Sequence, residues 1–129
     1  FLFAQLEKLE FINRKRIEIW QRYHNFFEDK CCELQRQSIK SNIINNGHIY
    51  YLIFDSMNER SRFIEKMLTN HVQTVFHYVP LHNSAMSNAV GLTQSLPVVE
   101  HLSDCLVRLP IWIDLAQDDV LQALERNLA

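Results

Sequence analysis

Three histidines, His71, His77 and His82, stand in a long stretch of the chain that contains no lysine, arginine, aspartate or glutamate. This stretch covers residues 67–99, and within it His77 and His82 lie on either side of Tyr78 and Pro80. An imidazole near neutral pH donates hydrogen bonds to phosphate or sugar oxygens. The pattern therefore makes His77, Tyr78 and His82 candidates for the wall of a pocket that binds a polar or anionic ligand. The alternative is that the histidines only pack against a strand or cap it.

The other reactive residues do not complete a catalytic or metal site in the sequence. A zinc site needs at least three ligands at suitable spacing, and Cys31, Cys32 and Cys105 lie far from the histidines. An odd number of cysteines with an adjacent pair is a poor disulfide framework, so we expect reduced thiols. The two glycines allow no Walker loop and no G-x-G-x-x-G motif, and no G-x-S-x-G elbow occurs. We predict no bound metal and no catalytic residue in this chain.

The lysines argue against covalent amine chemistry within the chain. A lysine nucleophile needs a desolvated or cationic setting that lowers its pKa. The lysines fall instead on polar helix faces or in a polar connector: Lys8, Lys15, Lys30, Lys40 and Lys66.

The overall composition is that of one ordinary globular domain or of part of a larger one. The chain has 129 residues, of which 47% are hydrophobic and 22% charged, with a net charge of −2. This charge argues against a dedicated nucleic-acid binder, although Arg14, Lys15 and Arg16 form a short basic run. No stretch approaches the ~20 apolar residues of a membrane span, and no signal-peptide pattern is visible. We expect a cytoplasmic protein.

The first part of the chain, residues 1–28, is predicted to form one long helix. Its apolar residues follow helical spacing but occupy more than one face: Leu2, Leu6, Leu9, Trp20, Tyr23 and Phe27, with Phe3, Phe11, Ile12, Ile19 and Phe26 beside them. Several apolar faces are typical of a helix at the seam between two packed bodies. Because the helical pattern is already present at Phe1, we expect the chain to be a piece of a longer protein.

The middle of the chain predicts a strand, a helix and a second strand. Residues 48–54 are aromatic and β-branched, as in a strand, and the Ser56 to Glu59 spacing is a capping box that starts a helix. This helix is expected to end near Asn70 and to bury Phe63, Ile64, Met67 and Leu68. Residues 72–82 are predicted to form a strand covered on both faces, with pairing that stops at Pro80 or runs along an edge.

The last third predicts a loop, a helix, a strand and a helix. A polar loop over 83–95 is followed by a helix over 97–104, with Ser95 as its cap and Pro97 in its first turn. The next predicted elements are a strand over 106–109, stopped by Pro110, and a helix capped by Asp114 with Val120, Leu121, Leu124 and Leu128 inside. The sequence thus predicts an α+β fold with a small three-stranded mixed or antiparallel sheet and helices packed against it. The helix between the first two strands predicts a right-handed crossover.

Four segments resemble, in order and spacing, the DegT/DnrJ/StrS group of sugar-nucleotide aminotransferases. The segment VFHYVPLH, residues 75–82, resembles the signature near the C-terminus of that family. Residues 1–23 are similar to the long helix after its large domain, residues 47–67 to its first small-domain strand and helix, and residues 96–120 to its closing helix, strand and helix. The chain departs from the family in its connector, residues 31–47, which is shorter and more polar, and in the few aromatic residues of 83–95.

The resemblance implies the following expectations. Residues 1–28 would link to a large domain outside this chain, and residues 29–129 would form the small C-terminal α+β domain. The parent enzyme would move an amino group, from glutamate, to the keto carbon of a dTDP-4-keto-6-deoxyhexose. Pyridoxal phosphate would sit on the large domain and would not bind this chain alone. His77, Tyr78 and His82 would contact the sugar nucleotide, and the protein would be a homodimer or a higher oligomer.

A different class of function remains open at the level of the sequence. The same order of elements is compatible with a stand-alone regulatory or binding module without enzymatic activity. A reading frame that extends upstream of Phe1 and carries a cofactor lysine favours the aminotransferase, whereas a methionine directly before Phe1 favours the module.

Overall fold

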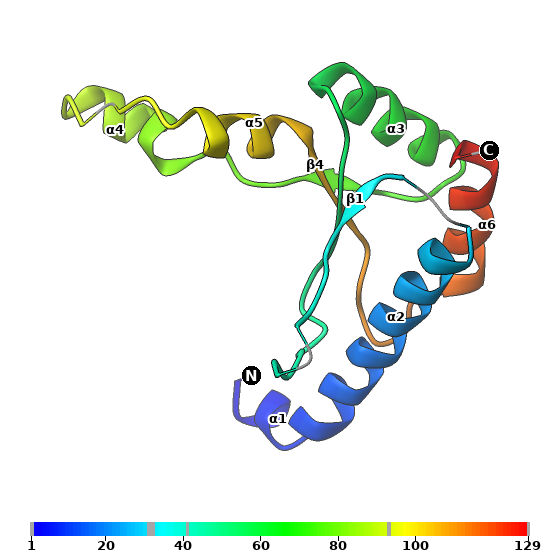
Figure 1. The fold of residues 1–129 in the computed structure, drawn as a ribbon. Helices are drawn as coiled ribbons and strands as arrows, with labels where there is room; N and C mark the ends of the chain where they lie inside the picture. The colour runs from blue at the N-terminus through cyan, green and yellow to red at the C-terminus, as the bar shows by residue number, and fades with distance from the viewer. Residues whose placement is uncertain (1, 31–32, 41, 93, 129) are drawn as a thin grey trace.

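The computed structural model describes residues 2–30, 33–40, 42–92 and 94–128 as a small sheet with helices beside it (Figure 1). In chain order the elements are α1 (Leu2–Leu6), α2 (Leu9–Asp29), β1 (Gln35–Arg36), β2 (Tyr50–Ile53), α3 (Met57–Thr69), β3 (Val75–Phe76), the 3-10 helix η1 (Leu81–Asn83), α4 (Ala85–Ala89), α5 (Pro97–Cys105), β4 (Leu106–Leu109) and α6 (Gln117–Leu128). The predicted α+β class is confirmed.

The sheet has four strands in the order β1-β2-β4-β3, and every neighbouring pair is antiparallel. Strands β2 and β3 therefore run in the same direction, with β4 inserted between them and α3 connecting them. The prediction of three strands missed β1, in which Gln35 pairs with Ile53 and Arg36 with Leu52. This strand has two polar residues and no apolar alternation, so only its partner β2 defines it.

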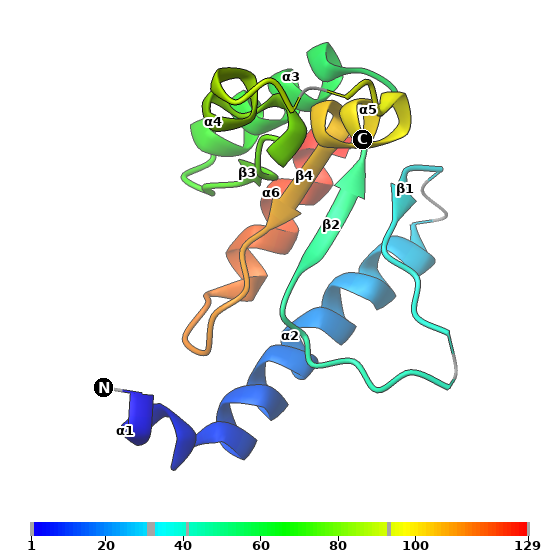
Figure 2. The same cartoon turned by 90° about the vertical axis from the view of Figure 1, so that its left-hand side faces the viewer.

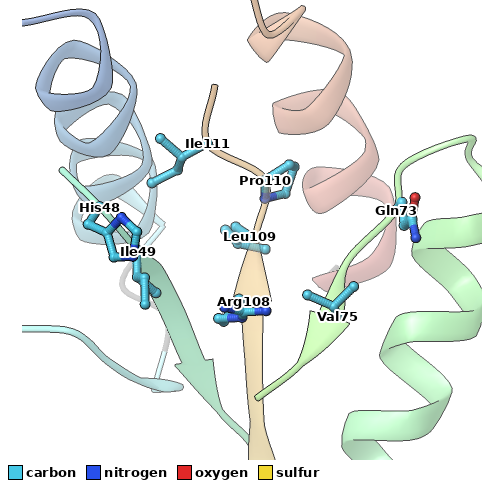
Figure 3. A pocket seen from close by; sticks show the side chains of 8 residues that line it. All are labelled: His48, Ile49, Gln73, Val75, Arg108, Leu109, Pro110 and Ile111. Atoms are coloured by element: carbon cyan, nitrogen blue, oxygen red, sulfur yellow. The ribbon is translucent and has the colours of Figure 1, made fainter. Parts of the chain in front are cut away.

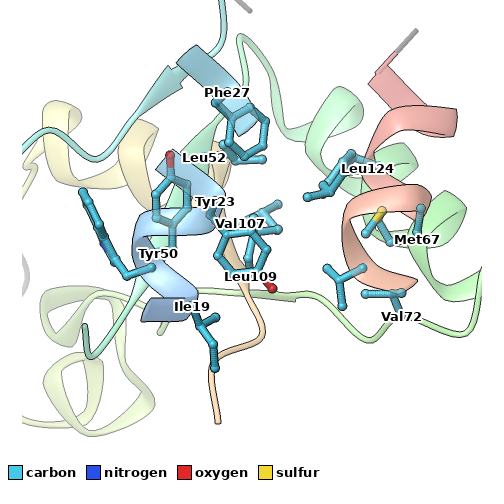
Figure 4. Packing of buried hydrophobic residues seen from close by; sticks show 14 of the residues in the cluster. Ile19, Tyr23, Phe27, Tyr50, Leu52, Met67, Val72, Val107, Leu109 and Leu124 are labelled. Carbon is cyan, nitrogen blue, oxygen red and sulfur yellow. The ribbon is translucent and has the colours of Figure 1, made fainter. Parts of the chain in front are cut away.

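One face of the sheet carries the hydrophobic core. Tyr50 and Leu52 of β2 and Val107 of β4 are 0% exposed, because alternate residues of a strand point to the same face. Helices α2, α3 and α6 pack their buried side chains into the same cluster (Figure 4): Ile19, Trp20, Tyr23 and Phe27, then Phe63 and Met67, then Val120, Ala123 and Leu124. Burial of these large side chains stabilises the fold by roughly 1.5–3 kcal/mol each.

Polar contacts fix α2 against the C-terminal part of the chain. The Tyr23 hydroxyl donates to the Pro110 carbonyl at 2.9 Å, and the Gln117 side-chain amide donates to the Ile19 carbonyl at 2.7 Å. Both donors are buried or half-buried, where an unmade hydrogen bond costs more than on the surface. They therefore set the position of α2 relative to β4 and α6.

The predicted helix over 1–28 is divided in the structure. Glu7 and Lys8 form a turn between α1 and α2, and only the second half of α2 reaches the core. Leu2, Leu6 and Leu9 of the predicted apolar stripe are 71%, 54% and 47% exposed. These side chains are exposed because α1 and the start of α2 extend past the end of the sheet, as Figure 2 shows.

The helix that follows β2 begins and ends as predicted. Ser56 Oγ accepts a hydrogen bond from the Glu59 amide at 3.2 Å, and α3 ends at Thr69, one residue before Asn70. Phe63 and Met67 are buried and Ile64 is half-buried, as expected. Leu68 is 61% exposed, so its predicted burial was wrong. The residue directly after Met67 lies 100° further round the helix, on its outer side.

The second predicted strand is much shorter than residues 72–82. Strand β3 pairs only with β4 and contains two residues, of which Val75 is 36% exposed and Phe76 is 52% exposed. It is the edge of the sheet rather than an internal strand, so the prediction of cover on both faces was wrong. Its pairing stops before Pro80, as predicted, because proline has no amide hydrogen to donate.

Residues 83–95 contain more helix than the predicted loop. Ser84 caps the short helix α4 by accepting from the Ser87 amide at 3.1 Å, directly after η1. In Figure 1, residues 77–92 and 94–105, which we call the arm, extend to the left, away from α2 and α6. The helical segments η1 and α4 were not predicted because each is short and because serines and asparagines interrupt the spacing of their apolar residues.

The strand over 106–109 is confirmed, but both predicted caps beside it were wrong. The residue before α5 is Leu96 rather than Ser95, and its amide donates to the Glu100 side chain at 3.0 Å. Helix α6 begins at Gln117, so Asp114 lies in the turn three residues upstream and does not occupy the capping position.

Candidate functional site

The second face of the sheet, which carries Tyr51, Ile53, Leu106, Arg108 and Val75, is only partly covered. The register places Arg108 of β4 directly between Tyr51 of β2 and Val75 of β3. These residues alternate with the core residues of the same strands and are half-buried or exposed. The cationic side chain of Arg108 thus lies at the centre of this face.

Two of the three predicted site residues meet next to Arg108. The His77 and Tyr78 rings are in edge contact, with centroids 5.0 Å apart. The guanidinium carbon of Arg108 lies 5.1 Å from the centroid of the Tyr78 ring, which is a cation–π distance. Tyr78 is 71% exposed, so its ring can contact a ligand or another part of the protein.

The surroundings of His77 favour the neutral form of its ring by lowering its pKa. Burial and the positive charge of Arg108 both lower the pKa of His77 from its ordinary value of 6.5. A neutral imidazole offers one donor and one acceptor nitrogen. Its Nδ1 atom is buried and has no hydrogen-bond partner among the residues that the structure describes. The ring can therefore exchange a hydrogen bond with a polar group that reaches it.

His82 contacts a different partner from the other two predicted residues. Its Nε2 lies 3.2 Å from Glu100 Oε1 of α5, and its side chain is 11% exposed. The same carboxylate accepts the Leu96 amide, and these two hydrogen bonds lower the pKa of Glu100, the amide first. His82 thereby joins η1 to α5 and holds the arm together, whereas His77 and Tyr78 lie beside the sheet.

A shallow bowl of about 170 Å³ lies across the second face of the sheet (Figure 3). We call it the Arg108 bowl, and its lining residues come from β3, β4 and the segments next to β2, β3 and β4: His48, Ile49, Gln73, Val75, Arg108, Leu109, Pro110 and Ile111. The sequence analysis did not single out Arg108 or His48. The available signal was one charged residue inside the otherwise apolar strand over 106–109.

The bowl is next to a fixed turn. Gly47 has φ +60°, and a Cβ built on it would lie 2.6 Å from the backbone carbonyl carbon of Arg16. The Arg16 guanidinium in turn contacts His48 Nδ1 at 2.7 Å and donates to the His48 carbonyl at 3.0 Å. This close approach of the turn to α2 sets the position of His48 at the rim of the bowl.

The lysines and the other reactive side chains lie apart from the Arg108 bowl, whose lining contains no lysine. The lysine side chains are exposed except that of Lys15, which is half-buried and paired with Glu18. No cluster of three or more His, Cys, Asp or Glu that could hold a metal occurs in residues 2–30, 33–40, 42–92 and 94–128. Cys105 is a buried free thiol whose pKa is raised by burial, and Cys31 and Cys32 lie outside the described residues. In that same part of the chain, no helix has the length and apolar character needed to cross a membrane.

Solved structures of aminotransferases share this fold. The aminotransferase TlmJ from Streptoalloteichus hindustanus matches 97% of the chain with a TM-score of 0.83 and 24% identity, over 34% of its own length. Spr1654 from Streptococcus pneumoniae, described as a candidate sugar aminotransferase and solved in its PMP form, matches 98% of the chain with a TM-score of 0.83 and 19% identity, over 32% of its length.

Two sequence comparisons match nearly the whole chain. The uncharacterized protein MJ1066 from Methanocaldococcus jannaschii is 28% identical over 125 residues, which are 93% of this chain and 32% of MJ1066. The chain therefore spans about a third of the length of these relatives. The family model for DegT/DnrJ/EryC1/StrS aminotransferases matches residues 1–126, nearly the whole chain. The chain belongs to the DegT/DnrJ/EryC1/StrS aminotransferase family.

Proposed function

We propose that this chain is the small C-terminal part of a pyridoxal-phosphate-dependent sugar-nucleotide aminotransferase. The observation that carries the proposal is the family match over residues 1–126, together with the one-third coverage of the relatives. Residues 1–28 connect to the large domain, and residues 29–129 form one wall of the active-site cleft. The enzyme acts in the cytoplasm.

The reaction we propose is transfer of an amino group from glutamate to the keto carbon of a dTDP-4-keto-6-deoxyhexose. The resemblance of residues 75–82 and of the three other segments supports this choice and dTDP-4-amino-4,6-dideoxygalactose as the product. Such an amino sugar is a precursor of surface polysaccharides such as enterobacterial common antigen. His77 and Tyr78 bind the sugar nucleotide from the small-domain side. His82 belongs to the same wall and positions the arm through Glu100.

The cofactor is held outside this chain. Pyridoxal phosphate supplies the electron sink for amino transfer when it is bound. The exposure of the lysines supports the assignment of the cofactor lysine to the large domain. By itself, the chain is then inactive and binds no pyridoxal phosphate.

The exposed apolar residues at the start of the chain support the proposal that α1 packs against another domain or subunit. Leu2, Phe3 and Leu6 of α1 are 71%, 74% and 54% exposed, which is unusual for three large side chains of one short helix. We propose that they pack against the large domain in a homodimer or a higher oligomer. In the isolated chain they drive self-association, which sedimentation velocity detects as a mass above that of a monomer. A clean monomer at high concentration contradicts this part.

The proposal is tested by comparing the chain with the protein expressed from the extended reading frame. The extended protein should transfer the amino group from glutamate to the keto sugar nucleotide, and the chain alone should not. Borohydride reduction in the presence of pyridoxal phosphate should modify one lysine of the extended protein and no single lysine of the chain. Stoichiometric modification of one lysine in the chain overturns the assignment of the cofactor to the large domain.

A further inference from the structure

The guanidinium of Arg108 has no acidic partner in the described structure. The side chain is half-buried, and its Nε atom is buried without a hydrogen-bond partner. The ion pairs among the described residues involve other cations. The guanidinium carbon of Arg108 lies 5.1 Å from the centroid of the Tyr78 ring. Arginine keeps its charge at every physiological pH. A partly desolvated cation without a carboxylate favours an anion at this position.

The other polar groups in the bowl are able to donate hydrogen bonds to the same ligand. Arg16 can only donate, so His48 must accept its hydrogen bond at Nδ1, where the two nitrogens are 2.7 Å apart. The proton of the neutral His48 ring then lies on Nε2, which is left as a donor. Gln73 adds a side-chain amide, and none of the eight lining residues is Asp or Glu.

The size and walls of the bowl suit one charged group. Its volume of about 170 Å³ is below the roughly 300–1,000 Å³ of pockets for whole drug-sized ligands. Apolar residues lie next to Arg108 in the lining, namely Ile49, Val75, Pro110 and Ile111, whereas the Leu109 side chain is buried in the core on the other face. A half-buried guanidinium attracts an anion more strongly than a fully solvated one. Figure 3 shows Arg108 at the middle of the bowl, with His48 on one side and Gln73 on the other.

We infer that the Arg108 bowl binds the carboxylate or phosphate group of a ligand. Arg108 supplies the bidentate donor pair that fits both groups, and His48 Nε2–H supplies another hydrogen bond. This inference concerns the residues of the chain itself and does not depend on the proposed amino transfer.

The test is a titration of the ¹⁵N-labelled chain with inorganic phosphate and, separately, with acetate, at constant ionic strength. Saturable shifts are expected for the backbone amides of Val75, Leu109 and Ile111, which line the bowl. Tighter binding of phosphate identifies a phosphorylated ligand, and tighter binding of acetate identifies a carboxylate ligand. The substitution Arg108→Gln should weaken the better probe by roughly 10- to 150-fold, the value of a hydrogen bond to a charged group.

Three further variants separate the site from general charge effects. Arg14→Gln is the control, because Arg14 is exposed and its guanidinium lies over the Phe11 ring, and it should leave the affinity unchanged. Arg108→Lys keeps the charge but loses the paired donors and should bind with intermediate affinity. His48→Ala should weaken binding less than Arg108→Gln. If Arg108→Gln does not fold, as judged by circular dichroism, Arg108→Lys and His48→Ala decide the question. Shifts that do not saturate, or that are equal in the Arg14 and Arg108 variants, overturn the inference.

Discussion

The two faces of the four-stranded sheet differ in how completely the chain itself covers them. On the core face, Tyr50, Leu52 and Val107 are fully buried under α2, α3 and α6. On the second face, the alternating residues Tyr51 and Arg108 are half-buried, and Arg108 has no acidic partner among the described residues. The residues of the first face therefore stabilise the folded chain, whereas those of the second face leave surface that a ligand or another domain can contact.

The largest expected effect of a substitution is on the core face. Phe27 is 0% exposed, and Phe27→Ala should lower the free energy of unfolding by about 3–5 kcal/mol through lost burial and a cavity. Phe3, in α1, is 74% exposed, so Phe3→Ala should change the free energy of unfolding by less than about 0.5 kcal/mol. Urea unfolding followed by circular dichroism measures both values. Equal effects would contradict the assignment of the core to the second half of α2.

A smaller effect is expected at the turn that positions His48. Gly47→Ala places a Cβ 2.6 Å from the Arg16 backbone at φ +60° and should destabilise the fold by about 1–3 kcal/mol. Gly91 is a matched control, since its φ is +71° but, beyond its chain neighbours, no atom of the described residues lies within 4 Å of the added Cβ. Thermal unfolding should rank Gly47→Ala well below Gly91→Ala in stability. The reverse order would show that the turn does not pack against α2 as described.

The smallest effect is expected in the arm and depends on pH. The Leu96 amide and His82 lower the pKa of Glu100 below its ordinary value of 4.5. The folded arm therefore binds a proton less readily than the unfolded chain, so this contribution is present above pH 4.5 and is lost as the pH falls below it. Glu100→Gln should increase amide exchange at the start of α5 near neutral pH and match the wild type in acid.

His82→Gln tests the same pair from the other side. This substitution removes the hydrogen bond from His82 that lowers the pKa of Glu100 but keeps the hydrogen bond from the Leu96 amide. Amide exchange at the start of α5 should therefore lie between that of the wild type and that of Glu100→Gln. If Glu100→Gln exchanges like the wild type at neutral pH, the carboxylate does not hold the arm together.

The parts of the fold that the sequence predicted are those with strong local signals. The Ser56 cap, α3 and the strand over 106–109 depend on residues close in sequence, and all three are confirmed. β1 and the edge position of β3 depend on pairing between distant residues, which no local pattern encodes. The turn at residues 7 and 8 in the first helix also had no local signal, because neither residue breaks a helix.

The candidate site was predicted only in part for the same reason. The uncharged stretch over residues 67–99 predicted His77, Tyr78 and His82 as site residues. In the structure His77 and Tyr78 contact each other whereas His82 contacts Glu100, and this division depends on where the arm leaves the sheet. Arg108 and His48 are 60 positions apart in the sequence, and the register of β2 with β4 brings their segments together. A bowl built from two strands and the segment before a third is therefore visible only in the folded chain.

The comparison of the two faces is tested most directly by His77→Ala in the protein expressed from the extended reading frame. His77 follows β3 beside the second face, and under the proposed function it binds the sugar nucleotide and contributes little to the core. The variant should keep the melting temperature of the wild type and should lower kcat/KM for the keto sugar nucleotide by roughly 10- to 150-fold, which corresponds to a lost hydrogen bond to a charged group. A variant that melts several degrees lower but turns over at the normal rate would contradict the account and show that His77 is a packing residue.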